Sequence, residues 1–201
     1  MSGLLFPIQT PRLLLRPHRW EDIEPLLAYY ADPVVARYIP WEPWSRHDAE
    51  EQVRKRVSRT GIVDASSILG LVVEREGRVI GDVLLWPADE TLSRGEVGWA
   101  FHPEFAGKGF ATEATQALFD VAFEHYGMHR LVAHVDARNV ASARLCERLG
   151  MTKEAHLRKD QWAKGEWTDT VIYGLLAEEW SHRFDPGAES RRCGPTLQSG
   201  G

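Results

Sequence analysis

The chain has 201 residues, of which 43% are hydrophobic and 26% are charged, and its formal net charge is −5 at pH 7. These proportions are typical of an ordinary soluble globule, and the length favours one well-packed domain over two. The negative charge argues against a nucleic-acid-binding protein and is compatible with a basic amine or peptide as a partner. No apolar run approaches membrane-spanning length and the first residues contain no signal-peptide core, so we expect a cytoplasmic protein without a membrane segment.

The two cysteines, Cys146 and Cys193, are too few for a disulfide framework and are expected to be free thiols. No cluster of His, Cys and Asp has ligand spacing, so no metal site is predicted. From Asp185 onward the chain is rich in Gly, Ser, Pro and Arg. We therefore expect a single domain over residues 1–184 and a disordered tail over residues 185–201.

The first sixty residues are predicted to contain one strand and three helices. The strand covers residues 10–16, and the first two helices cover residues 21–31 and 34–39, according to the spacing of apolar side chains. Ser45 resembles an N-cap, with Asp48 three residues further on as a variant of the capping box. The helix that follows is heavily charged and is expected to face solvent.

The segment Pro40-Trp41-Glu42-Pro43-Trp44 places two large aromatic side chains where a loop is usually polar. One interpretation is a lid packed over the edge of the core. Another is a wall of a substrate pocket, to which Trp41 and Trp44 would contribute. Both can hold at once.

Two apolar runs, at residues 67–74 and 78–86, flank Glu76 and Gly77, which is a hairpin signal. A further alternating segment begins at Glu96. The three segments are expected to form a meander of antiparallel strands.

A strand, a glycine pair and a helix follow one another between residues 95 and 126. Pro103 ends the strand because it has no amide hydrogen, and Gly107 and Gly109 come next. Residues 111–126 then carry apolar side chains at helical spacing. The first amides of a helix lack internal partners and lie at the positive end of its dipole, so this arrangement can hold a phosphate group. A glycine pair by itself also fits a tight loop that only turns the chain.

Residues 130–135 are predicted to form a strand parallel to the one that starts at Glu96, because a helix and a long crossover connect them. Residues 152–158 and 165–176 are expected to form a closing hairpin.

A short helix follows Asn139 as N-cap and ends before Gly150. Helical spacing places Asn139, either Ser142 or Ala143, and Cys146 on one face of it. A plain capped helix explains the pattern without any function.

Taken together, three motifs resemble the GNAT N-acetyltransferases, and most closely their RimJ/RimL branch, which acetylates protein N-termini. They are the run AGKGFATEA at residues 106–114, the N-x-x-S signature ending in Leu-Gly-Met at residues 139–151, and the D-x-x-x-Y-x-L-L-x-x-E-W ending at residues 169–180. Ala106 departs from the Gln or Arg of the family loop. The resemblance covers most of residues 8–182.

The resemblance implies an α/β (α+β) fold with a mixed, centrally splayed sheet flanked by helices, and acetyl-coenzyme A as the cofactor. Loop amides would hold the pyrophosphate, and the preceding strand would pair with the pantetheine arm as an added strand does. The strands that carry Phe101 and His134 would separate just beyond Phe101. The residues predicted to bind the cofactor are Trp99, Ala100, Phe101, Gly107, Lys108, Gly109, Phe110, Ala111, Thr112 and Asn139.

For the acid that protonates the leaving thiolate, Ser142 is preferred narrowly over Cys146, which occupies the place of a Tyr in many relatives. Protonation by solvent is a third possibility. Glu96 is the predicted base, and a glutamate in solvent or paired with Arg94 is the alternative. The isolated histidines, His102, His134 and His156, are expected to be packed or surface residues.

The predicted function is the transfer of an acetyl group from acetyl-coenzyme A to a primary amine, with a protein or peptide N-terminus preferred, by a monomer or a homodimer. The alternatives within the enzymes are a small-molecule amine, such as an aminoglycoside, and another acyl group, such as succinyl. The alternative from another class is a coenzyme A-binding module without catalysis.

Overall fold

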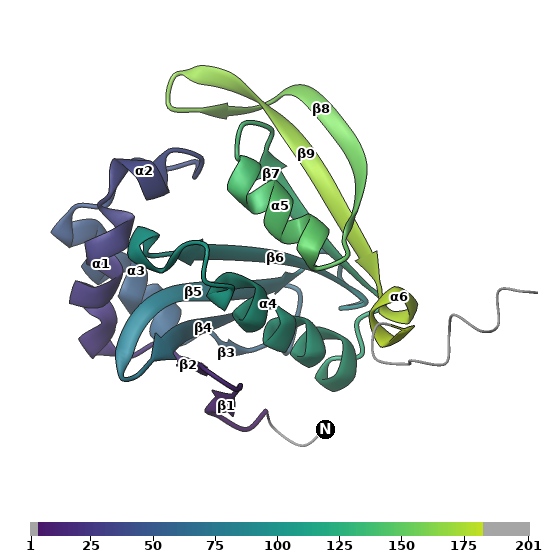
Figure 1. Ribbon diagram of the computed structural model, residues 1–201, viewed down its shortest axis with the longest axis horizontal. Helices are drawn as coiled ribbons and strands as arrows, with labels where there is room; N and C mark the ends of the chain where they lie inside the picture. The colour runs from purple at the N-terminus through teal and green to yellow at the C-terminus, as the bar shows by residue number, and fades with distance from the viewer. Residues whose placement is uncertain (1–3, 183–201) are drawn as a thin grey trace, which may run out of the picture.

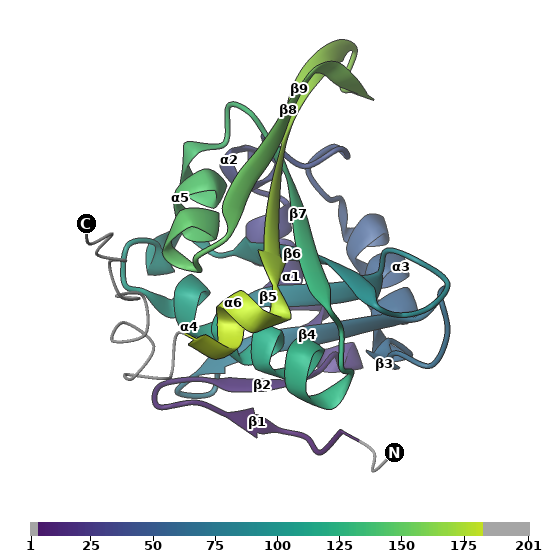
Figure 2. The ribbon, with the colours of Figure 1, turned by 90° about the vertical axis from the view of Figure 1, so that its right-hand side faces the viewer.

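The structure is a computed structural model that describes residues 4–182, so the predicted tail at residues 185–201 and Cys193 lie outside the described residues. The described chain forms a nine-stranded mixed sheet flanked by helices, as predicted (Figures 1 and 2). The strands are β1 Ile8–Gln9, β2 Leu14–Pro17, β3 Thr60–Gly61, β4 Ile68–Arg75, β5 Arg78–Pro87, β6 Arg94–Phe101, β7 Arg130–Asp136, β8 Thr152–Ala163 and β9 Glu166–Leu176. The helices are α1 Ile23–Tyr30, α2 Pro33–Ala36, α3 Arg46–Val57, α4 Phe110–Asp120, α5 Val140–Arg148 and α6 Ala177–His182.

The strand order is β1-β2-β4-β5-β6-β7-β9-β8, with β3 added to β4. The predicted meander of β4, β5 and β6 is confirmed, and both of its pairs are antiparallel. Its first turn places Glu76 and Gly77 at φ values of 52° and 75°, the left-handed conformation that a two-residue hairpin turn requires. The closing hairpin is also confirmed, and its second strand, β9, inserts between β7 and β8.

The parallel pair β6–β7 was predicted correctly, but the strands separate earlier than expected. They pair at only three positions, and the last pair is Glu96 with Val132. Beyond it β6 stays paired with β5 and β7 stays paired with β9, so each strand follows the twist of its own antiparallel neighbour and the two diverge (Figure 1). The split therefore opens directly after Glu96, and not beyond Phe101.

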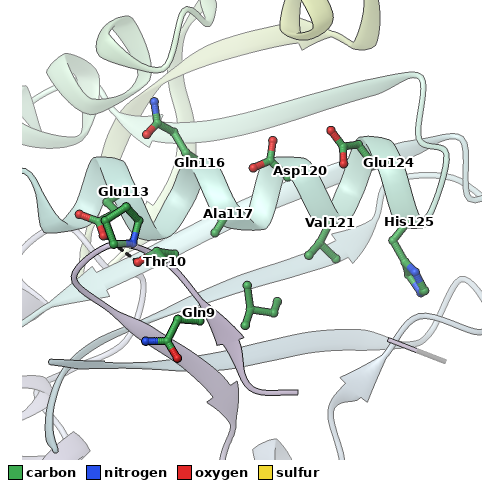
Figure 3. A pocket seen from close by; sticks show the side chains of 11 residues that line it. Gln9, Thr10, Glu113, Gln116, Ala117, Asp120, Val121, Glu124 and His125 are labelled. Atoms are coloured by element: carbon green, nitrogen blue, oxygen red, sulfur yellow. Dashed lines mark hydrogen bonds between the residues drawn. The ribbon is translucent and has the colours of Figure 1, made fainter. Parts of the chain in front are cut away.

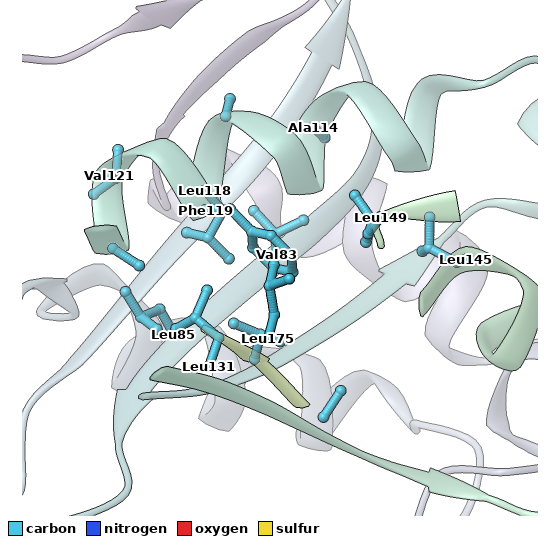
Figure 4. Packing of buried hydrophobic residues seen from close by; sticks show 14 of the residues in the cluster. Val83, Leu85, Ala114, Leu118, Phe119, Val121, Leu131, Leu145, Leu149 and Leu175 are labelled. Atoms are coloured by element: carbon cyan, nitrogen blue, oxygen red, sulfur yellow. The ribbon is translucent and has the colours of Figure 1, made fainter. Parts of the chain in front are cut away.

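Apolar residues are buried on both faces of the sheet. One core joins the strands to α4, α5 and α6 (Figure 4), and its members include Val83, Leu118, Leu131, Leu145 and Leu175. A second core on the opposite face is formed mainly by α1 and α3 with β4 to β6, and it includes Leu26, Val53, Val72 and Ala100. Each fully buried Val or Leu side chain contributes about 1.5–3 kcal/mol through burial.

The predicted helices are present with different ends. The helix expected over residues 111–126 is α-helical over Phe110–Asp120 and continues as a π-helical turn over Val121–His125. The capping box of Ser45 and Asp48 is confirmed at the start of α3. That helix is not purely a solvent face, because the Arg56 side chain is 2% exposed. No helix in residues 4–182 is long and apolar enough to cross a membrane.

A buried polar network attaches α1 and α3 to the centre of the sheet. Asp82 on β5 accepts hydrogen bonds of 2.9 Å from the hydroxyls of Tyr29 and Tyr30. Arg56 of α3 also donates to this carboxylate, and His18 Nε2 lies 3.6 Å from it. Burial by itself would raise the pKa of Asp82, but Arg56 and His18 outweigh it and hold the pKa below its usual value.

Candidate active site

The loop between β6 and α4 has the backbone conformation of a phosphate-binding loop. Gly107 and Gly109 have φ values of +74° and +81°, and Gly109 is the N-cap of α4. A Cβ atom placed on Gly107 would meet nothing within 4 Å, so the loop is open on that side. Because α4 is eleven residues long, its first amides and its dipole favour an anion at this end. The geometry thus fits the pyrophosphate of coenzyme A.

Arg12 of the N-terminal segment contacts this loop, and the sequence did not predict this contact. Its guanidinium donates to the Lys108 carbonyl at 3.1 Å and lies 4.6 Å from the centre of the Phe110 ring. Glu113 in the first turn of α4 accepts bonds from Arg12 and from the Thr10 hydroxyl. Thr10 and Arg12 lie in the segment predicted as the first strand, residues 10–16, but apolar spacing does not predict which residues a strand will contact.

The remaining residues of the predicted loop lie in the first turn of α4. The Phe110 side chain is buried in the first core, so that only its backbone is available to a ligand. Ala111 is partly buried, and the Thr112 hydroxyl accepts a bond of 3.4 Å from Arg148 of α5.

The part of β6 beyond the split is free of β7. Trp99, Ala100 and Phe101 all lie past the last β6–β7 pair and remain paired with β5 on the other side. Backbone groups on such an edge can accept an extended ligand as an added strand. This is the position predicted for the pantetheine arm.

On the α5 side of the split, Ser142 is held by two contacts. Its amide donates to Asn139 Oδ1 at 3.0 Å, and its hydroxyl oxygen lies 3.2 Å from Trp99 Nε1. Because an indole N–H can only donate, the serine oxygen accepts this bond and its own proton is free to point elsewhere. Asn139 keeps the predicted N-cap role, which occupies its side-chain oxygen.

Cys146, one turn further along α5, is fully buried in the first core. Burial raises the pKa of its thiol to about 12. A thiol without access to the split is badly placed to protonate a leaving group, so the geometry favours Ser142.

Glu96 pairs with His134, a partially exposed histidine of β7, and this contact was not predicted from the sequence. The distance between Glu96 Oε1 and His134 Nδ1 is 3.0 Å. The hydrogen bond that His134 donates to this carboxylate raises the pKa of His134, against the opposing effect of burial. The alternative partner considered for Glu96, Arg94, instead contacts Asp89 at 2.7 Å.

The Glu96–His134 pair and Ser142 lie on opposite faces of the sheet. Successive side chains of a strand point to opposite faces. Val97 and Ala133 belong to the core under α4 and α5, so Glu96 and His134 point to the face that carries α1 and α3. The split is therefore flanked by possible proton acceptors on one face and by the phosphate loop and Ser142 on the other.

The two tryptophans of the segment 40–44 lie in different environments. Trp44 is 5% exposed, stacks on Tyr30 with ring centroids 4.0 Å apart, and lies under the Arg56 guanidinium. It is a residue of the second core, which argues against a direct contact with substrate. Trp41 is 45% exposed, so it remains the candidate for an aromatic wall of the substrate pocket.

The tip of the β8–β9 hairpin reaches the loop after α2. Lys164 donates to the Ala36 carbonyl at 2.6 Å. A small cavity lies between these segments and the end of β7, lined on the hairpin side by Gln161, Ala163, Lys164, Glu166 and Thr168. The hairpin tip therefore lies beside the residues that lead into the segment 40–44, since Pro40 also lines this cavity.

A larger cavity of about 450 Å³ lies between β1 and α4 (Figure 3). Glu113, Asp120 and Glu124 line one side of it. None of the predicted site residues lines it, so it is separate from the split. No group of three or more His, Cys, Asp or Glu side chains in residues 4–182 is placed to hold a metal ion.

Comparison with known proteins decides the family. Residues 12–152 match the acetyltransferase (GNAT) domain. The chain belongs to the GNAT acetyltransferase family. N-acetyltransferase YnaD of Bacillus subtilis is 30% identical over 176 residues, which cover 87% of this chain and 99% of YnaD.

Two further GNAT relatives bear on fold and acceptor. A crystal structure of a GNAT acetyltransferase from Bacillus anthracis superposes with a TM-score of 0.78 at 28% identity, covering 87% of this chain and all of that one. Spermidine N(1)-acetyltransferase of Escherichia coli is 28% identical over 183 residues, covering 91% of this chain and 92% of the enzyme. GNAT acetyltransferases use acetyl-coenzyme A, so this chain is an N-acetyltransferase that depends on it.

Proposed function

We propose that this GNAT enzyme transfers an acetyl group from acetyl-coenzyme A to a primary amine that arrives as a cation. The observation that supports it is the split between β6 and β7, with the phosphate loop on one face and the Glu96–His134 pair on the other. The coenzyme supplies the acetyl group as a thioester, which an uncharged amine can attack.

Each residue then has a defined task in this proposal. The amides of residues 107–112 bind the pyrophosphate, and the free edge of β6 aligns the pantetheine arm. Ser142 places its hydroxyl proton near the sulfur as the bond to carbon breaks. The Glu96–His134 pair takes up the proton that the ammonium must lose before it can attack.

For the acceptor, a protein or peptide N-terminus is the first candidate, because the sequence motifs resemble the RimJ/RimL branch. A polyamine is the second candidate, and the relative named for spermidine favours it, since it matches this chain over nearly its full length. Both acceptors carry the cationic amine that acidic side chains near the split would attract. We propose a cytoplasmic enzyme, active as a monomer or a homodimer.

The test is turnover by the full chain with acetyl-coenzyme A and a panel of N-terminal peptides, spermidine and aminoglycosides. Release of free thiol that depends on one class of amine would identify the acceptor. Replacement of acetyl- by succinyl-coenzyme A checks the acyl group. Coenzyme A binding in a calorimeter without turnover on any amine would instead support a binding module and contradict the proposal.

A further inference from the structure

His134 lies at the point where β6 and β7 separate. Glu96 belongs to the last paired position, opposite Val132. His134 is two residues beyond Val132 and points to the same face, so it is the first such side chain of β7 past the last pair. Its side chain is 42% exposed, compared with 25% for Glu96. A molecule that enters the split from this face can reach the imidazole more easily than the carboxylate.

The contact with Glu96 also fixes the state of the imidazole ring. Since Glu96 Oε1 lies 3.0 Å from Nδ1, the neutral ring carries its hydrogen on Nδ1 and its lone pair on Nε2. Within residues 4–182, Nε2 has no hydrogen-bond partner. A carboxylate that holds one ring nitrogen and leaves the other free is an arrangement suited to accepting a proton at Nε2.

We propose that His134 is the catalytic base that receives the proton of the acceptor ammonium at Nε2, and that Glu96 is a positioning residue that acts through it. This inference rests on the acetyl transfer proposed above and names the residue that begins it. Besides Glu96 on β6, Asp160 on β8 is the charged group that acts on this imidazole. Both are acidic, so they attract an ammonium group and stabilise the imidazolium that forms.

The protons balance in two steps. The ammonium passes one proton to His134 Nε2, and His134 later releases it to solvent. The uncharged nitrogen then forms a bond to the acetyl carbon while the carbon–sulfur bond breaks. The second proton that the nitrogen loses is the one that the departing thiolate gains, through Ser142 or water.

The pH dependence of kcat/KM tests this assignment. His134 must be neutral to act, so activity should rise with pH through its pKa, which the Glu96 hydrogen bond raises above the ordinary value. We expect His134→Gln to abolish this rise and to lower kcat/KM by about 100-fold. Glu96→Gln should retain the rise but move it to lower pH, because a neutral amide no longer stabilises the imidazolium. One acceptor is used throughout, so that its own ionisation is common to all variants.

A second readout does not depend on turnover. NMR titration of the imidazole in the coenzyme-free protein should give a His134 pKa that agrees with the kinetic midpoint, and Glu96→Gln should lower both by the same amount. The matched control is His156→Gln, because His156 forms a similar exposed pair with Asp169 at 2.8 Å on the closing hairpin. It should leave the kinetic profile unchanged.

An active, folded His134→Gln enzyme with the wild-type pH profile would overturn this inference and leave the proposed function intact. A kinetic midpoint that differs from the NMR pKa of His134 in both the wild type and Glu96→Gln would also overturn this inference. If the wild-type chain acetylates no amine, the proposed function fails, and the inference fails with it.

Discussion

Gly109 begins α4 with a φ of +81°, a backbone conformation that residues with a Cβ rarely adopt. A Cβ there would also lie 3.3 Å from Arg12 Nη2, one of the groups that brace the loop. We expect Gly109→Val to weaken coenzyme A binding by at least about 1 kcal/mol, roughly fivefold in Kd, because the loop amides are displaced. Calorimetry with the folded variant measures this.

Gly77→Val is the control for backbone strain. Gly77 has a φ of +75° in the β4–β5 turn, and a Cβ there would meet nothing within 4 Å. It should lose stability without losing affinity for coenzyme A. Unchanged affinity for coenzyme A in Gly109→Val would show that this loop does not belong to the cofactor site.

Substitutions of Ser142 and Cys146 should have different effects, although the two residues lie one turn apart on α5. Ser142→Ala should lower kcat at least about tenfold and leave the KM for acetyl-coenzyme A near the wild-type value, because only the transfer of a proton to sulfur is lost. Cys146→Ala should keep its kcat and lose stability on the order of 1 kcal/mol, because this side chain is fully buried. Steady-state kinetics and urea unfolding separate the two effects.

A slower Cys146→Ala enzyme with wild-type stability would reverse this assignment. Equal and unimpaired kcat in both variants would mean that solvent protonates the thiolate.

At the scale of elements, the loop between α2 and α3 has one tryptophan in the core and one at the surface. Trp44→Ala should destabilise the protein by about 3–5 kcal/mol, because it removes a ring stacked 4.0 Å from Tyr30. Trp41→Ala should keep the melting temperature and raise the acceptor KM, with the acetyl-coenzyme A KM unchanged, because an exposed aromatic can hold a cationic amine. Thermal unfolding and kinetics of both variants test the division.

A Trp41→Ala enzyme with an unchanged acceptor KM would exclude this side chain from the pocket. A lowered melting temperature together with changes in both KM values would instead indicate that Trp41 contributes to the core.

At the scale of the whole molecule, Asp82 connects the two helices of the second core to the sheet. Asp82→Asn should destabilise the protein by about 3–5 kcal/mol at pH 7, because it leaves the buried Arg56 without its carboxylate. The pKa of Asp82 is lowered in the folded state, so its contribution is complete above the unfolded pKa of about 3.9 and is lost as pH falls through the folded value. Urea unfolding should therefore show the wild type and Asp82→Asn converging below pH 4.

Glu51→Gln is the matched control, because it makes the same chemical change at an exposed carboxylate paired with Lys55 on α3. Its effect at pH 7 should be small, since solvent screens such pairs. A loss in Asp82→Asn no larger than in Glu51→Gln would show that the network does not stabilise the fold.

The sequence by itself determined the local elements and the family. The turn at Glu76 and Gly77, the capping box at Ser45, and the helix that begins after Asn139 were all predicted correctly. Each depends on hydrogen bonds and φ preferences among residues within a few positions of one another, which a linear pattern records. The motifs in order were sufficient to place the chain among the GNAT acetyltransferases before any contact was known.

Only the tertiary structure decided where the split opens and which side chains meet there. The separation after Glu96 results from the pairing of β6 with β5 and of β7 with β9, and so does the meeting of Glu96 with His134. The burial of Trp44 and Cys146 likewise depends on which helices cover each face of the sheet. These contacts join residues far apart in the chain, and apolar periodicity states that a side chain is buried without stating its neighbours.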